Sequence, residues 1–272
     1  MKLFIDSANL EEIEKAYATG VIDGITTNPS LLKKALSDLK KGKKKFSIEE
    51  YVTDILIIAK NTPVSLEVNS TDHDAIVKEA TALYNRFNPI SNNVYIKVPI
   101  NTSLTGKTKQ TEAIRAIKTL TQSRIPVNAT LVFTPEQALL AAKAGASIVS
   151  IFTGRIDDYI RTQHGIGFEK GDYYPQDGLV KDNKHVQDNG IVSGVDCIKQ
   201  AVSIIKQHNL RSMILAASIR NTRQLREVAL AGAHIATVPF DVIMSSLNHP
   251  KTLEGIKIFS DDVPNEYLKL LK

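Results

Sequence analysis

Short apolar runs and longer amphipathic stretches alternate along the whole 272-residue chain, and this alternation limits the possible folds more than any other feature. The apolar runs have the length of buried strands, and the stretches between them repeat their apolar residues at helical spacing. Strand and helix in strict alternation predict a parallel sheet with right-handed crossovers. The predicted strands are residues 3–6, 24–27, 64–68, 94–98, 126–131, 148–152, 213–217 and 235–238.

The number of strand–helix units decides the architecture. Amphipathic stretches between the strands include residues 11–19, 48–60, 74–85, 110–121, 135–144, 194–208 and 222–231. Eight strand–helix units in about 250 residues are typical of a (β/α)₈ TIM barrel, which fills such a length as one domain. We therefore predict a single α/β barrel domain over residues 1–272. An open doubly wound sheet is the alternative, but no glycine-rich fingerprint follows the first strand.

Three segments lie outside this alternation. Residues 33–46 contain seven lysines and are predicted to be a solvated surface segment that is helical in part. Residues 163–190 form a polar insertion after the sixth strand. A loop of that length is often functional, so a lid, a subunit contact and disorder are all open. A C-terminal helical tail is expected from about residue 251.

Composition and charge exclude several classes of protein. Apolar residues make up 43% of the chain and charged residues 23%, which is typical of a soluble globular protein. The net charge of +5 suits anionic substrates but is too weak to predict nucleic-acid binding. The lysine-rich segment also lacks the interleaved aromatic residues that stack on bases. We find no signal peptide and no apolar run of about 18 residues, so we expect no membrane contact and a cytoplasmic location.

Cysteine and histidine residues give no sign of a metal centre or a disulfide framework. The single cysteine, Cys197, suits a reducing compartment. The six histidines show no ligand spacing. We expect no metal and no cofactor.

One strand carries a charge where it should be apolar. Lys97 lies in the middle of Val94-Tyr95-Ile96-Lys97-Val98-Pro99. A buried ammonium loses its hydration and must find partners or give up its proton. Burial of this kind is the usual route to an amine that is neutral, and so nucleophilic, near pH 7. The alternative is a lysine whose head group reaches solvent from the strand end.

The neighbouring strands favour the nucleophile. Every predicted strand except the last carries polar residues near its carboxyl end, where barrel enzymes keep their active sites. Alternate residues share a face of a strand, so these side chains can point into one barrel. Unpaired buried polar groups cost about 1–3 kcal/mol each, so stability alone does not explain such a layer. The residues are Asp6, Thr26, Thr27, Asn28, Ser65, Glu67, Lys97, Asn128, Thr130, Ser150, Ser218 and Arg220.

An amine, two carboxylates and several hydroxyl or amide groups suit carbonyl chemistry. An amine adds to a ketone and loses water, and the resulting iminium accepts electrons when the neighbouring C–C bond breaks. Carboxyl groups can move the protons that these steps require. Arg155, Ser218 and Arg220 follow strands six and seven, a region where barrels often bind phosphate. The pattern predicts a sugar phosphate as substrate.

From Met1 to about residue 250, the chain resembles the transaldolase family, most closely its short bacterial and archaeal branch, which also contains fructose-6-phosphate aldolase. The resemblance lies in an ordered set of motifs at the strand ends. They are Ile5-Asp6, Gly24-Ile25-Thr26-Thr27-Asn28-Pro29-Ser30, Ser65-Leu66-Glu67-Val68, Ile96-Lys97-Val98-Pro99, Asn128-Ala129-Thr130-Leu131-Val132-Phe133, Ser150-Ile151-Phe152-Thr153-Gly154-Arg155-Ile156-Asp157 and Ala216-Ala217-Ser218-Ile219-Arg220.

The resemblance implies a role for each site residue. Lys97 would form a Schiff base with the donor ketose, and Glu67 would shuttle protons through a water held with Thr130. Asp6 would take the proton of the C4 hydroxyl as the C3–C4 bond breaks. The dihydroxyacetone unit would contact Thr27, Asn28, Asn128, Ser150 and Phe152. The phosphate would bind to Arg155, Ser218 and Arg220.

Two positions favour the transferase over the aldolase. The aldolases of this family carry Tyr where this chain has Phe152 and Gln where it has Glu67. Without a phenol to protonate the enamine, the three-carbon unit should wait for an aldose acceptor. Ile151, Thr153 and the length of the insertion depart from the family pattern. We therefore expect a transaldolase, with simple aldol cleavage or non-catalytic sugar-phosphate binding as alternatives. The resemblance also implies a homo-oligomer, a pentamer or decamer.

Overall fold

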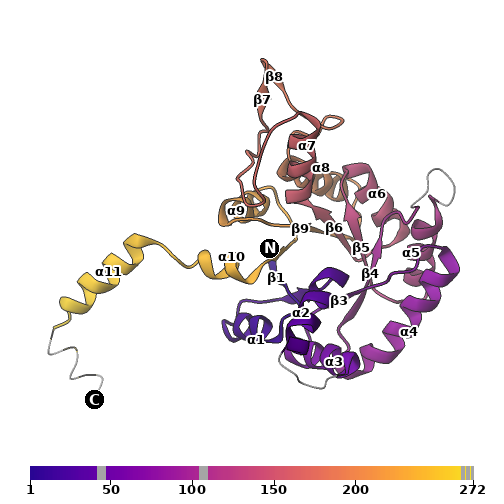
Figure 1. Cartoon of the computed structure of the whole chain (residues 1–272), viewed down its shortest axis with the longest axis horizontal. Helices are drawn as coiled ribbons and strands as arrows, with labels where there is room; N and C mark the ends of the chain where they lie inside the picture. The colour runs from indigo at the N-terminus through magenta and orange to yellow at the C-terminus, as the bar shows by residue number, and fades with distance from the viewer. Residues whose placement is uncertain (42–46, 104–109, 265–266, 268–269, 271–272) are drawn as a thin grey trace.

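A closed barrel of parallel strands forms the centre of the molecule (Figure 1). The computed structural model describes residues 1–41, 47–103, 110–264, 267 and 270. Around the barrel the strands follow the order β1-β10-β9-β6-β5-β4-β3-β2. The predicted barrel and its eight strands are confirmed. The strands are β1 (Lys2–Asp6), β2 (Gly24–Thr26), β3 (Val64–Glu67), β4 (Val94–Pro99), β5 (Val127–Val132), β6 (Ile148–Phe152), β9 (Met213–Ala217) and β10 (Ile235–Val238).

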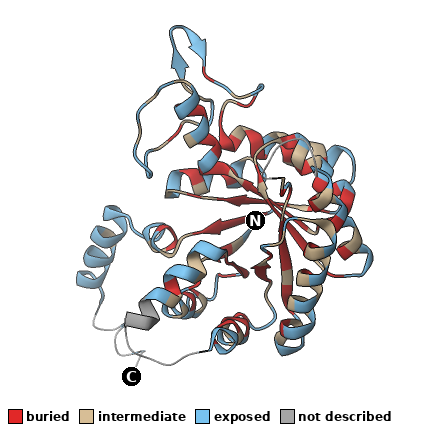
Figure 2. Ribbon diagram, turned by 45° about the vertical axis from the view of Figure 1, so that its right-hand side comes forward, coloured by how far each residue is buried: buried red, intermediate tan, exposed pale blue. Residues whose placement is uncertain are grey.

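Helices surround the barrel, and those before α11 bury apolar residues against it (Figure 2). Local sequence fixes their ends. Asn9 caps α1 by accepting a hydrogen bond from the Glu12 amide, and Gly145 ends α6 with a φ of 99°. The helices are α1 (Leu10–Ala18), α2 (Pro29–Lys41), α3 (Ile48–Ala59), α4 (His73–Ser91), α5 (Glu112–Gln122), α6 (Pro135–Ala144), α7 (Thr153–Gln163), α8 (Gly194–Gln207), α9 (Thr222–Leu230), α10 (Phe240–Ser245) and α11 (Pro250–Asp261).

The register between neighbouring strands sets the heights of the polar side chains. Glu67 of β3 pairs with Lys97 of β4, and Lys97 pairs with Asn128 of β5. Three polar residues therefore lie at one level of the barrel, near the carboxyl ends of their strands. The register shifts in β5 between Ala129 and Val132, where Leu131 has a φ of 54°.

The insertion at residues 163–190 is an ordered arm, so disorder does not describe it. It contains a short antiparallel hairpin of β7 (Val180–Lys181) and β8 (Lys184–His185), which extends beyond the barrel at the top of Figure 1. The buried Arg161 of α7 donates to the carbonyl of Tyr173 at 2.6 Å. The Tyr173 hydroxyl donates to Glu227 of α9 at 2.7 Å. These contacts hold the arm against two helices of the barrel.

The other two unusual segments behave differently from each other. The lysine-rich segment begins inside α2, as expected for its helical part, and residues 42–46 lie outside the described residues. Helix α11 begins at Pro250 and projects away from the barrel (Figure 1). It has no buried residue. Among the described residues, no helix is long and apolar enough to cross a membrane. The single domain over 1–272 stays a prediction.

A buried carboxylate joins three helices on one side of the barrel. Asp157 of α7 accepts a hydrogen bond from the Gly194 amide of α8 at 2.7 Å. Its other oxygen accepts one from the Gln224 side chain of α9 at 2.8 Å. Gln224 in turn accepts from the Arg220 amide at 2.8 Å. Burial raises the pKa of Asp157 to about 7, because it disfavours the charged carboxylate.

The raised pKa of Asp157 predicts a pH-dependent stability. Between pH 4 and 7 the folded chain holds a proton that the unfolded chain has released, so stability rises as pH falls through this window. The slope is about 1.4 kcal/mol per pH unit. Asp157→Asn cannot titrate, so the native chain should gain stability relative to this variant from pH 7 down to 4, with no change above the window. Urea unfolding at several pH values measures the difference.

The exposed Asp54→Asn on α3 is the control for the change from carboxylate to amide. Parallel stability curves for the native chain and Asp157→Asn would contradict the raised pKa.

Candidate active site

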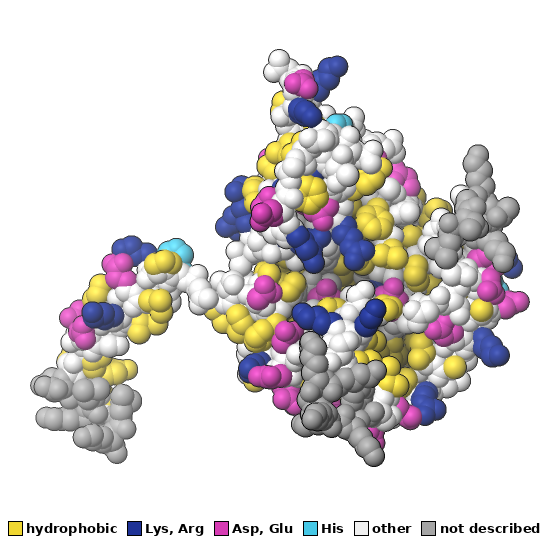
Figure 3. Space-filling model, in the orientation of Figure 1, with side chains coloured by type: hydrophobic (Ala, Val, Ile, Leu, Met, Phe, Trp, Pro, Cys, Tyr) yellow, Lys and Arg dark blue, Asp and Glu magenta, His cyan; other side chains and the backbone are white. Residues whose placement is uncertain are grey.

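A cavity of about 660 Å³ opens at the carboxyl ends of the strands. Figure 3 shows its mouth as a hollow near the centre of the view, with Lys and Arg side chains on both sides. Loops after β1, β2, β6, β9 and β10 supply its walls. Eight of the predicted site residues line it: Asp6, Asn28, Lys97, Ser150, Phe152, Arg155, Ser218 and Arg220.

Lys97 lies inside the barrel and not in bulk solvent. The residue is only 4% exposed, which rules out the solvent-reaching alternative. Its Nζ lies 3.0 Å from Glu67 Oε2 and donates to the backbone carbonyl of Thr27 at 3.3 Å. The ring of Phe152 lies 5.9 Å from the same nitrogen. The amine is therefore held between a proton acceptor and an aromatic wall.

A chain of hydrogen bonds orients the amide beside this amine. Ser150 Oγ donates to Asn128 Oδ1 at 2.7 Å, and Asn128 Nδ2 donates to Ser65 Oγ at 3.0 Å. All three residues are buried. Of the three, Ser150 lines the cavity. Asn128 holds Ser150 from behind, so the floor of the cavity has fixed donors and acceptors.

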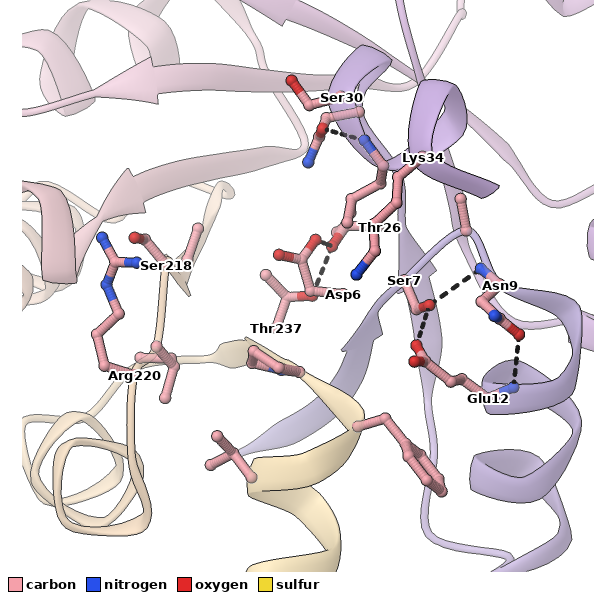
Figure 4. A pocket seen from close by; sticks show the side chains of 18 of the residues that line it. Asp6, Ser7, Asn9, Glu12, Thr26, Ser30, Lys34, Ser218, Arg220 and Thr237 are labelled. Atoms are coloured by element: carbon pink, nitrogen blue, oxygen red, sulfur yellow. Dashed lines mark hydrogen bonds between the residues drawn. The ribbon is translucent and has the colours of Figure 1, made fainter. Parts of the chain in front are cut away.

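The carboxylate of Asp6 is held by a hydroxyl group from the neighbouring strand β2 (Figure 4). Thr26 of β2 donates to Asp6 Oδ1 at 2.8 Å, and Thr26 also hydrogen-bonds to Thr237 of β10 at 2.5 Å. Burial raises the pKa of Asp6, while the nearby charges of Lys97 and Arg155 and the bond from Thr26 oppose the rise. A carboxylate with a raised pKa accepts a proton more readily.

Thr237 corrects the expectation that the last strand contributes no polar group. It lines the cavity together with Thr26. Sequence reasoning passed over Thr237 because it stands alone among Ile, Ala and Val in a four-residue strand. Lys34 of α2, which points toward the cavity in Figure 4, and Lys170 of the insertion also line it and were not singled out. Lys170 shows that the insertion reaches the cavity.

The cationic end of the cavity combines two guanidinium groups with a strained turn. Arg155 is exposed and stacks over the Phe152 ring, 4.9 Å from its centroid. Arg220 pairs with Asp158 at 2.7 Å, and its buried Nε has no hydrogen-bond partner among the described residues. Ser218 has a φ of 61°, the left-handed region that non-glycine residues seldom adopt. Strain of this kind often marks a binding site.

Two predicted threonines occupy other positions. Thr27 does not line the cavity, since its hydroxyl donates to the Ser65 carbonyl at 2.8 Å and joins β2 to β3. Its neighbour Thr26 takes the place in the cavity. Thr130 is fully buried, and its Oγ1 has no partner among the described residues. A buried hydroxyl in that state suits a bound water.

The site carries the groups for imine chemistry: a buried amine, a carboxylate in contact with it, and a second carboxylate nearby. No group of three or more potential metal ligands occurs in the part of the chain that the structure describes. The guanidinium groups at one end have the geometry for a phosphate.

Comparison with known proteins agrees with this chemistry. A family described as Transaldolase/Fructose-6-phosphate aldolase matches residues 3–270. A probable transaldolase of Alkaliphilus metalliredigens is 39% identical over 262 residues, covering 96% of this chain and 97% of the relative. Probable transaldolases of Chlorobium phaeobacteroides and Carboxydothermus hydrogenoformans are each 38% identical, covering 96% of this chain and 96% and 97% of the relatives. The chain therefore belongs to the transaldolase/fructose-6-phosphate aldolase family.

Proposed function

We propose that the protein is a transaldolase, which moves a dihydroxyacetone unit from a ketose phosphate to an aldose phosphate through a Schiff base on Lys97. Fructose 6-phosphate and sedoheptulose 7-phosphate are the expected donors. The observation that carries the proposal is the buried amine of Lys97, 3.0 Å from Glu67, at the floor of a cavity with two guanidinium groups at one end. The relatives described as probable transaldolases support it.

Imine formation begins with attack of Lys97 Nζ on the C2 carbonyl of the donor. The attacking amine must lose a proton, and Glu67 is placed to accept it. Glu67 then returns a proton to the carbinolamine hydroxyl, which leaves as water. The unpartnered hydroxyl of Thr130 supports a role in holding that water. Hydrolysis of the product imine reverses these steps.

Cleavage of the C3–C4 bond needs a base at the C4 hydroxyl. Asp6 takes that proton, the bonding electrons flow into the C2 iminium, and an enamine remains on Lys97 while the aldose phosphate leaves. Thr26, which is itself hydrogen-bonded to Thr237, fixes the carboxylate that performs this step. The acceptor aldehyde then reacts with the enamine, and Asp6 returns the proton.

Orientation of the substrate follows from the two ends of the cavity. Ser150 and Asn28 line the part near Lys97 and would hold the dihydroxyacetone hydroxyls. Arg155, Arg220 and Ser218 line the other end and would bind the phosphate of donor and acceptor. A bidentate guanidinium–phosphate contact fixes distance as well as charge.

Aldol cleavage that releases dihydroxyacetone is the second candidate, because the family contains both activities. Release requires protonation of the enamine. The aromatic ring beside Lys97 belongs to Phe152, which has no hydroxyl and cannot supply that proton. The enamine should therefore persist until an acceptor arrives.

The assembly and the location of the protein are proposals of the same kind. We propose a homo-oligomer, a pentamer or decamer as the family resemblance implies. Exposed apolar side chains on α11, such as Leu253, Ile256 and Phe259, support a contact between copies. Sedimentation at micromolar concentration should give a mass well above 29.9 kDa, and a monomer would contradict it.

The cytoplasmic location stays a prediction that cell fractionation would check.

A trapping experiment tests the amine. Borohydride added to the protein with fructose 6-phosphate should reduce the imine and leave a stable adduct on Lys97, which peptide mass spectrometry locates. Lys97→Ala should form no adduct and show no turnover, because Lys97 is the amine that contacts the proton acceptor Glu67. The exposed Lys78→Ala on α4 is the matched control and should keep full activity. An active Lys97→Ala variant would refute the mechanism.

Acceptor dependence separates the transferase from the aldolase. With fructose 6-phosphate alone, a transaldolase should release glyceraldehyde 3-phosphate in a single burst that matches the number of sites. Addition of erythrose 4-phosphate should start continuous turnover. A coupled assay of glyceraldehyde 3-phosphate measures both. Continuous release of dihydroxyacetone at the same rate with and without the acceptor would favour the aldolase.

A further inference from the structure

The ion pair of Lys97 and Glu67 lies between two separate pockets. Lys97 lines the cavity of about 660 Å³ described above, and Glu67 is absent from that lining. Glu67 instead lines a second pocket, of about 440 Å³, on the other side of α2. The Glu67 side chain is 12% exposed, against 5% for Lys97. The two partners thus face solvent from opposite directions.

The second pocket combines polar and apolar walls. Within the described residues its lining comes from α2, from the start of α3 and from the end of β3: Pro29, Leu32, Lys33, Leu36, Ser37, Ile48, Glu67 and Asn69. Lys33, Ser37 and Asn69 are exposed, and Glu67 is partly buried. A pocket whose lining includes polar groups such as these can hold water.

Each turnover at Lys97 releases one water molecule when the imine forms and consumes one when the product imine is hydrolysed. Attack of the neutral amine on the ketone gives a carbinolamine, and its hydroxyl takes a proton from Glu67 and leaves as one water to give the iminium. Release of the product consumes one water and returns the amine and a ketone. During both steps the sugar occupies the first cavity and covers Lys97 on that side.

We propose that the second pocket is the route by which water and protons pass between solvent and Glu67, independently of the sugar. The inference rests on the proposed function. Water released during imine formation leaves through the second pocket, and water that hydrolyses the product imine enters through it. The donor and acceptor sugars use the first cavity. The oxygen expelled from the donor therefore escapes to solvent, and the oxygen in the product comes from solvent.

A bulky group in the second pocket tests the route. Ser37→Cys places a thiol in its lining. The chain's own cysteine, Cys197, is fully buried, so the new thiol is the one accessible to reagents. One sample receives a pyrene maleimide and a second only a methylthio group. Asp54→Cys on α3, outside both linings, carries the same pyrene as the matched control.

Retention of an oxygen label is the measurement. Fructose 6-phosphate with ¹⁸O at C2 reacts with erythrose 4-phosphate in ordinary water, and early sedoheptulose 7-phosphate is reduced and weighed by mass spectrometry. An enzyme-free blank corrects for spontaneous exchange. When the second pocket is open, the expelled ¹⁸O-water should exchange with solvent, so the product should lose the label. Pyrene at residue 37 should trap the expelled water for reuse, so retention should rise several-fold over both controls.

Unchanged retention in the pyrene-labelled Ser37→Cys protein would overturn the route, whether or not its turnover falls. If Ser37→Cys does not fold, Lys33→Cys offers a second position in the same lining. Failure of the proposed function is distinguishable, because the unmodified protein would then make no sedoheptulose 7-phosphate at all.

Discussion

The ion pair between Lys97 and Glu67 is the interaction on which the rest of the site depends. Each charge taken alone into the barrel interior would cost several kcal/mol, and removal of either partner leaves the other uncompensated. The pair is stable because β3 and β4 place the two residues at the same register, so the strands already hold the two side chains next to each other. The carbonyl of Thr27 satisfies a further proton of the ammonium. The barrel thus holds a reactive pair by backbone geometry.

The remaining polar groups extend this arrangement around the barrel in two directions. On one side, a chain of two hydrogen bonds joins Ser150, Asn128 and Ser65. On the other, Asp6 is tied to Thr26, and Thr26 to the last strand. Strand ends are rigid, so side chains attached to them lose little further entropy when substrate binds. Groups with longer reach, such as Arg155 on α7, lie farther out, where the proposed contact with phosphate would tolerate adjustment.

Sequence alone predicts the barrel because eight buried strands with intervening amphipathic helices have few other ways to pack. It also predicts Lys97 and Glu67, since alternation within a strand decides which residues share a face. It does not separate Thr26 from Thr27. Strand β2 has only three residues, too few to decide which of residues 26 and 27 points into the barrel, and both of these residues are threonine. The sequence also does not decide whether the insertion is ordered, because the residues that anchor it, Arg161 and Glu227, belong to helices far apart in sequence.

Helix α11 has a consequence for how this protein behaves on dilution. None of its twelve residues is buried among the residues that the structure describes. Isolated helices of that length are marginal in water, because the nucleation cost is spread over few hydrogen bonds. In the proposed oligomer a neighbouring copy would stabilise α11, so this helix would melt separately from the barrel once the copies are too dilute to meet.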